Sequence, residues 1–415
     1  MIRFIHTADL HLDSPFKGLK RMHPHLYENV YQSTFQSFYH IVSKAIEEAV
    51  DFLLISGDIY DEENQSVKAQ AFLRDQMRRL KAVGIPVYLS HGNHDFLGRE
   101  TLKLQMPDNV MIFGTEPQTE LFATKSQEKV AVTGFSYQTR WVKERMIQQY
   151  PVRQSNVDFH IGMLHGFLEG IESSEGVYAP FSIQELNEKH YDYWALGHIH
   201  KRDLIQEHPP IVYPGNIQGR NPNELGEKGA YLVSLEKGFS PRLEFFTTSP
   251  IIWKEKIVSL KGLSSLQSLF AAVETEMEAA VEEKQGVFLS IIIEDKEDLP
   301  EEVIEKIQEG DLLEGFNQTD YQPFVYLYKL KIAPQEKQVP FSFDQKMQES
   351  FEKSGQDLKD KEIFRKKLRD LFKNQIVRSR FSELEQDSQL QEEILTAAQN
   401  LLFEDIFFEE EEDRS

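Results

Sequence analysis

The chain has 415 residues, 40% of them hydrophobic and 11% aromatic, with a formal net charge of −22 and no cysteine. This length predicts two or three domains, and the apolar content excludes a wholly disordered chain. The missing thiols exclude a disulfide framework, a cysteine nucleophile and a cysteine-bound zinc. No apolar run is long enough for a membrane span, and the first residues lead into a strand rather than a secretory signal, so a cytoplasmic protein is expected.

The negative charge is concentrated in the second part of the chain. Residues 1–250 carry a net −6 and residues 251–415 a net −16. Such a protein repels nucleic acid at long range and gains little from counterion release over its whole surface. If it acts on DNA, it needs a local basic patch, a bound metal or a partner.

From residue 1 to about 250, short apolar runs alternate with amphipathic helical patterns, which is typical of an α/β domain. The expected strands are residues 2–7, 52–56, 87–90, 130–133, 159–164 and 193–196, and the expected helices are 26–49 and 67–83. Further strands at 211–213, 230–235 and 243–247 come without long helices between them, which indicates antiparallel strands at the end of the sheet system.

The pattern changes after Ser249-Pro250. A strand at 253–258, a helix at 266–281, a strand at 287–293, a helix at 301–308 and a strand at 324–332 give the order β-α-β-α-β. The remainder of the chain is expected to be helical, is highly charged and ends in an acidic tail, Glu409–Asp413. We therefore predict a domain over 1–250, a smaller domain over 251–335 and a helical region over 336–415.

Polar clusters lie directly after five of the expected strands of the first domain. They are Asp9-Leu10-His11, Gly57-Asp58, Gly92-Asn93-His94-Asp95, His165-Gly166 and Gly197-His198-Ile199-His200. Ligand sites in α/β sheets form at the carboxyl ends of strands, so these clusters can converge on one crevice. Carboxylate, imidazole and amide oxygen suit a pair of divalent metals, and a shared carboxylate such as that of Asp58 can bridge two cations. Each cluster alone is weak evidence, but five in succession predict a metal site.

These five clusters resemble, in order, the motif set of the calcineurin-like metallophosphoesterases. The opening His6-Thr7-Ala8-Asp9-Leu10-His11-Leu12-Asp13-Ser14-Pro15-Phe16 resembles the DNA-repair exonuclease branch of SbcD-like proteins, and most closely the YhaO-type proteins. The resemblance covers roughly residues 1–250 and implies a sandwich of two mixed β-sheets flanked by helices. In outline, 251–335 resembles the capping domain of that branch.

The resemblance also implies roles for single residues. One metal would be held by Asp9, His11, Asp58 and His200, and the other by Asp58, Asn93, His165 and His198. Manganese is the expected ion, and a water activated by the two metals would attack the phosphoester. His94 would lie beside the scissile phosphate as a catalytic residue that either stabilises charge or protonates the leaving oxygen, with Asp95 orienting its ring.

Two basic features have an open interpretation. Arg220 ends the loop after the last expected ligands, and it would either clamp a substrate phosphate or be an ordinary surface arginine. Residues 359–380 carry a net charge of +6, which indicates either a solvated helix or a helix that docks onto DNA or a partner. In SbcD-like nucleases the C-terminal part binds an SbcC-like coiled-coil ATPase, and such nucleases commonly form homodimers.

The sequence therefore predicts a metal-dependent DNA exonuclease that acts in DNA repair with an ATPase partner. A phosphatase or small-nucleotide phosphodiesterase of the same superfamily is the first alternative, which the acidic charge favours. A nuclease-like scaffold with weak catalysis is the second alternative, and the complete set of expected ligands together with His94 argues against it.

Overall fold

The computed structural model describes residues 1–16, 24–61, 65–98, 104–170, 178–281, 285–296, 298–317, 321–333 and Lys366. Residues Met1–Ile332 form one compact unit. The predicted helical region over 336–415, including nearly all of the basic stretch 359–380 and the acidic tail, lies outside the described residues. The division at residues 250 and 335 stays a prediction.

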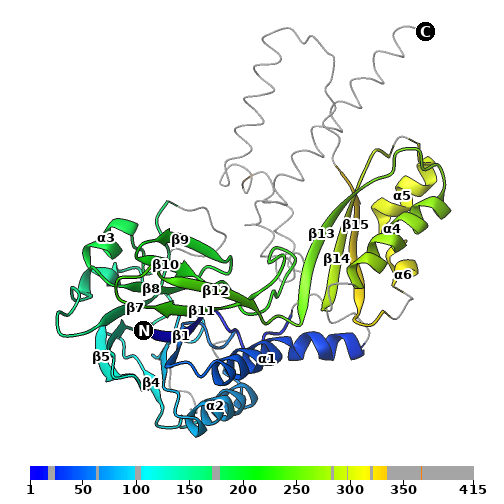
Figure 1. Ribbon diagram of the computed structural model, residues 1–415. Coiled ribbons are helices and arrows are strands. Elements are labelled where there is room, and N and C mark those ends of the chain that lie inside the picture. Colours follow the sequence, from blue (N-terminus) through cyan, green and yellow to red (C-terminus); the bar gives the residue numbers. More distant parts are fainter. Residues whose placement is uncertain are drawn as a thin grey trace, which may run out of the picture. The chain divides into compact units, whose positions relative to one another are not determined.

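Two six-stranded mixed sheets make up the first part of the chain (Figure 1). The first sheet has the order β12-β11-β1-β2-β3-β4, in which β1 to β4 are parallel and β11 is antiparallel to both of its neighbours, β1 and β12. Its strands are β1 (Ile2–Thr7), β2 (Phe52–Ser56), β3 (Val87–Ser90), β4 (Val110–Ile112), β11 (Gly229–Leu235) and β12 (Arg242–Thr247).

The second sheet has the order β5-β6-β7-β8-β10-β9, with β6, β7, β8 and β10 parallel and the edge strands β5 and β9 antiparallel to their neighbours. Its strands are β5 (Gln118–Ala123), β6 (Lys129–Gly134), β7 (Phe159–His165), β8 (Tyr193–Gly197), β9 (Asp203–Glu207) and β10 (Pro210–Tyr213).

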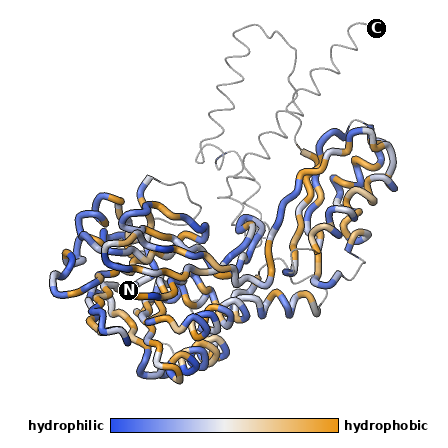
Figure 2. The backbone as a smooth tube through the Cα atoms, viewed as in Figure 1, coloured by the Kyte–Doolittle hydropathy of each residue, from blue (hydrophilic) through white to orange (hydrophobic). Residues whose placement is uncertain are grey.

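The two sheets pack face to face through alternating apolar side chains. Phe4 and Phe52 of the first sheet share a buried cluster with Ile161 and Tyr193 of the second. Helices α1 (Pro24–Glu47) and α2 (Val67–Ala82) cover the outer face of the first sheet, and α3 (Ile183–Glu188) and the 3-10 turn η2 (Met146–Gln149) pack on the second. Figure 2 shows the apolar strands inside and polar segments at the surface. The predicted sandwich of two mixed sheets flanked by helices is confirmed.

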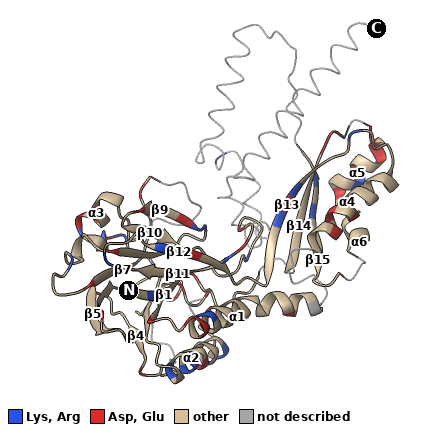
Figure 3. Ribbon diagram, viewed as in Figure 1, with Lys and Arg blue, Asp and Glu red and all other residues tan. Residues whose placement is uncertain are grey.

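A third, fully parallel sheet, β13-β14-β15, comes next in the chain. Its elements are β13 (Ile251–Ser259), α4 (Leu266–Val281), β14 (Gly286–Glu294), α5 (Glu301–Glu309), α6 (Leu313–Phe316) and β15 (Val325–Ile332). The three helices bury one face of this sheet. On its other face Trp253 and Phe288 pack with Phe16 and Val30 of the preceding part of the chain. Figure 3 shows acidic residues, coloured red, along α4 and α5, in the part of the chain that carries most of the negative charge.

Candidate metal centre

The five polar clusters are brought together because of how the strands are ordered. β1, β2 and β3 are parallel neighbours in the first sheet, and β7 and β8 are parallel neighbours in the second. Each strand therefore delivers the residues after its carboxyl end to the same edge of the sandwich. There the ten candidate residues, apart from half-buried His94 and Arg220, are buried.

The backbone at this edge is held in conformations that non-glycine residues rarely adopt. Asp9, His11, Asp58 and His198 have φ values of 50°, 42°, 49° and 99°. Such left-handed conformations persist only where the surroundings enforce them, and they cluster at functional sites. Gly92 is required for a different reason, because a Cβ there would lie 2.3 Å from Oδ1 of Asp58 and 2.7 Å from Nε2 of His165.

One half of the centre is formed by two imidazoles that face each other. Nε2 of His11 lies 3.1 Å from Nε2 of His200. The opposite nitrogen of each ring faces a carboxylate: Nδ1 of His200 is 2.8 Å from Oε1 of Glu224, and Nδ1 of His11 is 3.4 Å from Oδ1 of Asp61. Nδ1 of His200 donates to Glu224, which leaves an Nε2 lone pair directed at His11. With the proton of His11 on Nδ1, facing Asp61, both Nε2 atoms would present lone pairs and would bind one cation between them.

The other half shows the same convergence of acceptor atoms. Nδ1 of His165 donates to the carbonyl oxygen of Ser56 at 3.0 Å, so in the neutral ring, which is the form that binds a metal, Nε2 carries the lone pair. That lone pair faces the amide oxygen of Asn93 at 3.0 Å and Oδ2 of Asp58 at 3.5 Å, and Nδ1 of His198 lies 3.2 Å from the same amide oxygen. The donor set of carboxylate, imidazole and amide oxygen around an acceptor-rich point fits a divalent cation.

The electrostatics of the buried groups agree with this interpretation. Burial raises the pKa of Asp9 to about 6. Burial opposes the charged form of Asp58 as well, but the imidazoles of His165 and His94 outweigh it and hold the pKa of Asp58 well below its usual range. Burial likewise opposes protonation of His165, yet the carboxylates of Asp58 and Asp9 raise its pKa to about 9. The carboxylates thus stabilise positive charge at the position where a cation would bind.

Asp9 occupies a more central position than the two predicted ligand sets imply. A carboxylate oxygen of Asp9 lies within 4.8 Å of ligand atoms of His11 and His200, and within the same distance of ligand atoms of Asp58 and His165. Both of its oxygens accept from the backbone N–H of His198 at 3.1 Å. The described residues therefore contain overlapping carboxylate–imidazole groups that fit a pair of cations: two of them share Asp9, and a third, made of His11, Asp61 and His94, shares His11 with the first.

His94 lies beside these groups, with its ring centroid 5.0 Å from that of His11. Its Nδ1 donates to the carbonyl oxygen of Asp61 at 2.9 Å. The prediction that Asp95 orients this ring is wrong, because the carboxylate of Asp95 instead accepts from Nδ1 of His91 and from the backbone N–H of Gly92 and Ile59. Asp95 therefore fixes the turn that carries Asn93 and His94.

Sequence reasoning missed two acidic residues of this region, Asp61 and Glu224. Asp61 lies three residues after Asp58 in the same turn, and this spacing was the one available signal. Glu224 lies in the loop after β10 and also accepts from Asn216 at 2.7 Å. Arg220 reaches the site, but its guanidinium is ion-paired with Asp61 and lies 3.8 Å from Glu224. Its predicted contact with a substrate phosphate stays a prediction.

Replacing Glu224 by Gln is expected to weaken metal binding by about 10- to 100-fold, because a carboxylate behind a ligating histidine fixes its tautomer and raises its basicity. The dissociation constant of Mn²⁺, measured by titration calorimetry, checks this. Glu185→Gln is the matched control, since Glu185 also pairs with an arginine, Arg145, but lies in α3 away from the centre. Equal affinity for Mn²⁺ in Glu224→Gln and the wild type would contradict the assignment.

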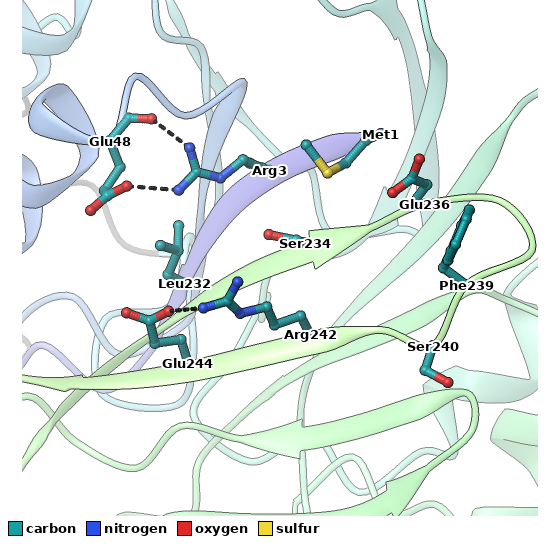
Figure 4. A pocket seen from close by; sticks show the side chains of 10 residues that line it. All are labelled: Met1, Arg3, Glu48, Leu232, Ser234, Glu236, Phe239, Ser240, Arg242 and Glu244. Carbon is teal, nitrogen blue, oxygen red and sulfur yellow. Dashed lines mark hydrogen bonds and ion pairs between the residues drawn. The ribbon is translucent and has the colours of Figure 1, made fainter.

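A separate pocket of about 520 Å³ lies at the opposite end of β1 (Figure 4). Arg3, which bonds to Glu48, and Arg242, which bonds to Glu244, are among the residues that line it. The lining contains no histidine and none of the predicted site residues. It is therefore distinct from the candidate metal centre.

The geometry fits a divalent-cation site at the edge of an α/β sandwich, and comparison with known proteins gives the family. The family model of the calcineurin-like phosphoesterases matches residues 2–202. The chain is 42% identical over 275 residues to YhaO, an uncharacterized metallophosphoesterase of Bacillus subtilis, which is 66% of this chain and 67% of that protein. The chain belongs to the calcineurin-like metallophosphoesterases, which are hydrolases that act on phosphoester bonds.

More distant relatives carry a more specific name. The DNA double-strand break repair protein Mre11 of Methanocaldococcus jannaschii is 28% identical over 244 residues, which cover 55% of this chain and 62% of the relative. Mre11 of Saccharolobus solfataricus is 25% identical over 313 residues, or 71% and 75% of the two chains.

Among the described residues, no helix is long and apolar enough to span a bilayer.

Proposed function

We propose that this protein is a DNA phosphodiesterase and exonuclease of DNA repair that uses two manganese ions and works with an SbcC-like ATPase. The observation that carries the metal-dependent part is the pair of imidazole nitrogens of His11 and His200 that face each other at 3.1 Å, with a carboxylate beside the opposite nitrogen of each ring. The distant similarity to Mre11 proteins supports DNA as the substrate.

The proposed ligands divide into two sets that share Asp58. Asp9, His11 and His200 would complete one set, and Asn93, His165 and His198 the other. When bound, the two cations supply an activated water near neutral pH and neutralise charge on the phosphoryl group.

The chain's own groups supply orientation and proton transfer. The bond from Nδ1 of His94 to the Asp61 carbonyl fixes the ring, so that its Nε2 is directed by backbone geometry rather than by a mobile carboxylate. A protonated His94 would give its Nε2 proton to the departing sugar oxygen. Glu224 and Asp61 would hold the two facing imidazoles in the required tautomers.

A small phosphomonoester or nucleotide is the alternative substrate, and the formal charge of −22 favours it. Hydrolysis of single-stranded DNA, duplex DNA and nitrophenyl phosphate esters should be compared with Mn²⁺ and without added metal. The proposal predicts Mn²⁺-dependent release of nucleotides from DNA ends. Rapid hydrolysis of the small ester, with intact DNA after prolonged incubation, would assign the site to the alternative.

The partner requires its own experiment. The full chain should co-purify with an SbcC-like coiled-coil ATPase from the same genome, and the ATPase should accelerate DNA cleavage. Removal of residues 336–415 should abolish the association while leaving hydrolysis of a nitrophenyl ester intact. Retained association in the truncated chain would overturn the assignment of this region as partner-binding, and failure of the full chain to associate would overturn the partner itself.

A further inference from the structure

One tryptophan is conspicuous by its exposure. The chain has three tryptophans. Trp194 and Trp253 are buried at 0% and 2% exposure, whereas Trp141 is 57% exposed. The guanidinium of Arg140 lies 5.1 Å from the centroid of the Trp141 ring, and the ring of Tyr178 lies 5.5 Å from it. The indole is thus supported from two sides while much of its surface faces solvent.

Trp141 is connected to the metal centre by one intervening ring. Tyr178 lies 5.5 Å from the ring of His198, a proposed ligand, at a steep interplanar angle of 65°. Trp141, Tyr178 and His198 therefore form a short path from the solvent-exposed indole to the buried centre. A phosphoester held at the metals would place its neighbouring nucleotide within reach of this path.

The loop that carries Trp141 is bonded to two segments of the centre. The backbone N–H of Gly98, which comes after the Asn93–Asp95 cluster, donates to the carbonyl oxygen of Gln138 at 3.0 Å. The backbone N–H of Ala179 donates to the carbonyl oxygen of Val142 at 2.7 Å. Tyr178 in turn accepts from the backbone N–H of Phe167, two residues after His165, at 2.9 Å. These bonds fix the backbone on both sides of Trp141 relative to the proposed ligands.

We propose that Trp141, supported by Arg140 and Tyr178, is the platform on which an unpaired nucleobase of the substrate stacks beside the scissile phosphate. This inference rests on the proposed function and specifies its substrate as a single-stranded end. Stacking on an exposed ring depends on the π-face that every base has and tolerates any sequence. Stacking also requires no net positive charge on the protein. It therefore supplies affinity for DNA that an acidic chain cannot obtain from long-range electrostatic attraction.

Binding is tested first, in the His94→Ala variant, so that the oligonucleotide stays intact. A single-stranded oligonucleotide with Mn²⁺ should quench the tryptophan fluorescence, because the other two tryptophans are buried. The quench should disappear in His94→Ala/Trp141→Phe, which keeps a smaller ring but removes the exposed indole. A quench of unchanged amplitude in that double variant would overturn the assignment of Trp141.

Cleavage is tested with a matched substrate. Trp141→Ala should raise the KM for a single-stranded oligonucleotide about 10- to 100-fold, and Trp141→Phe should restore most of the loss. An oligonucleotide with abasic sugars at the two terminal positions should be cleaved equally by the wild type and Trp141→Ala, since it has no base to stack there. A structural role of Trp141 would instead lower activity on both substrates.

The control is Phe239→Ala. Phe239 is also an exposed aromatic residue, at 70%, but it lines the pocket at the opposite end of β1. Its replacement should leave the KM unchanged, and an equal effect of both variants would contradict a specific platform. If the wild type cleaves no DNA but its fluorescence is quenched, the proposed function fails, and only the stacking of a base on Trp141 stands. If DNA is cleaved normally by Trp141→Ala, the platform fails and the proposed function stands.

Discussion

Replacing Asp58 by Asn is expected to lower phosphoester hydrolysis by about a thousandfold or more, because Lewis-acid stabilisation by bound metal is worth several kcal/mol. Asn has nearly the shape of Asp but no charge. The side chain would still accept from the backbone N–H of His94, now 3.0 Å from Oδ1, so the turn should stay folded. The charge that faces Nε2 of His165 at 3.5 Å and Nε2 of His11 at 3.9 Å would be lost.

The measurement is the stoichiometry of Mn²⁺ binding together with the rate of ester hydrolysis. The wild type should bind two ions per chain and Asp58→Asn fewer. Asp51→Asn is the matched control, since Asp51 precedes β2 as Asp58 follows it, and it also accepts from one backbone N–H, that of Arg3 at 2.8 Å. Two bound ions and normal turnover in Asp58→Asn would show that Asp58 is not the bridging ligand.

Replacing His94 by Ala is expected to reduce kcat on DNA by about 10²- to 10⁴-fold, the usual contribution of a general acid. The loss should depend on the leaving group. A sugar alkoxide needs a proton as it departs, whereas a nitrophenolate leaves without one, so hydrolysis of a nitrophenyl ester should be far less affected. Binding of Mn²⁺ should be unchanged, because no proposed ligand is removed.

Rates on the two substrates, measured side by side, distinguish proton donation by His94 from stabilisation of charge on the phosphoryl group. If His94→Ala slowed both substrates equally, His94 would stabilise charge on the phosphoryl group rather than protonate the leaving oxygen. His40→Ala is the control, since His40 is a surface residue of α1 whose ring contacts the carbonyl oxygen of Thr248. It should leave both rates unchanged.

Elements with strong apolar patterns could be predicted from the sequence. The expected strand 2–7 and the strands at 52–56 and 87–90 coincide with β1, β2 and β3, because these strands are buried on both faces and read as continuous apolar runs. The strands that were missed, β4, β5 and β9, lie at sheet edges. Their residues are mostly half-buried or exposed, so burial imposes little apolar pattern on them.

The sequence by itself determined the fold class, the enzyme family and the set of candidate ligands, because strand ends and residue types are local properties of the chain. Only the tertiary structure decided which residues contact these candidate ligands. Glu224 accepts a hydrogen bond from His200, although the two are 24 residues apart in the chain. Asp95 bonds to His91 instead of His94. The ring of Tyr178 contacts both Trp141 and His198. Such contacts depend on how separate strands and loops pack in three dimensions, and the spacing of residues along one chain does not encode that geometry directly.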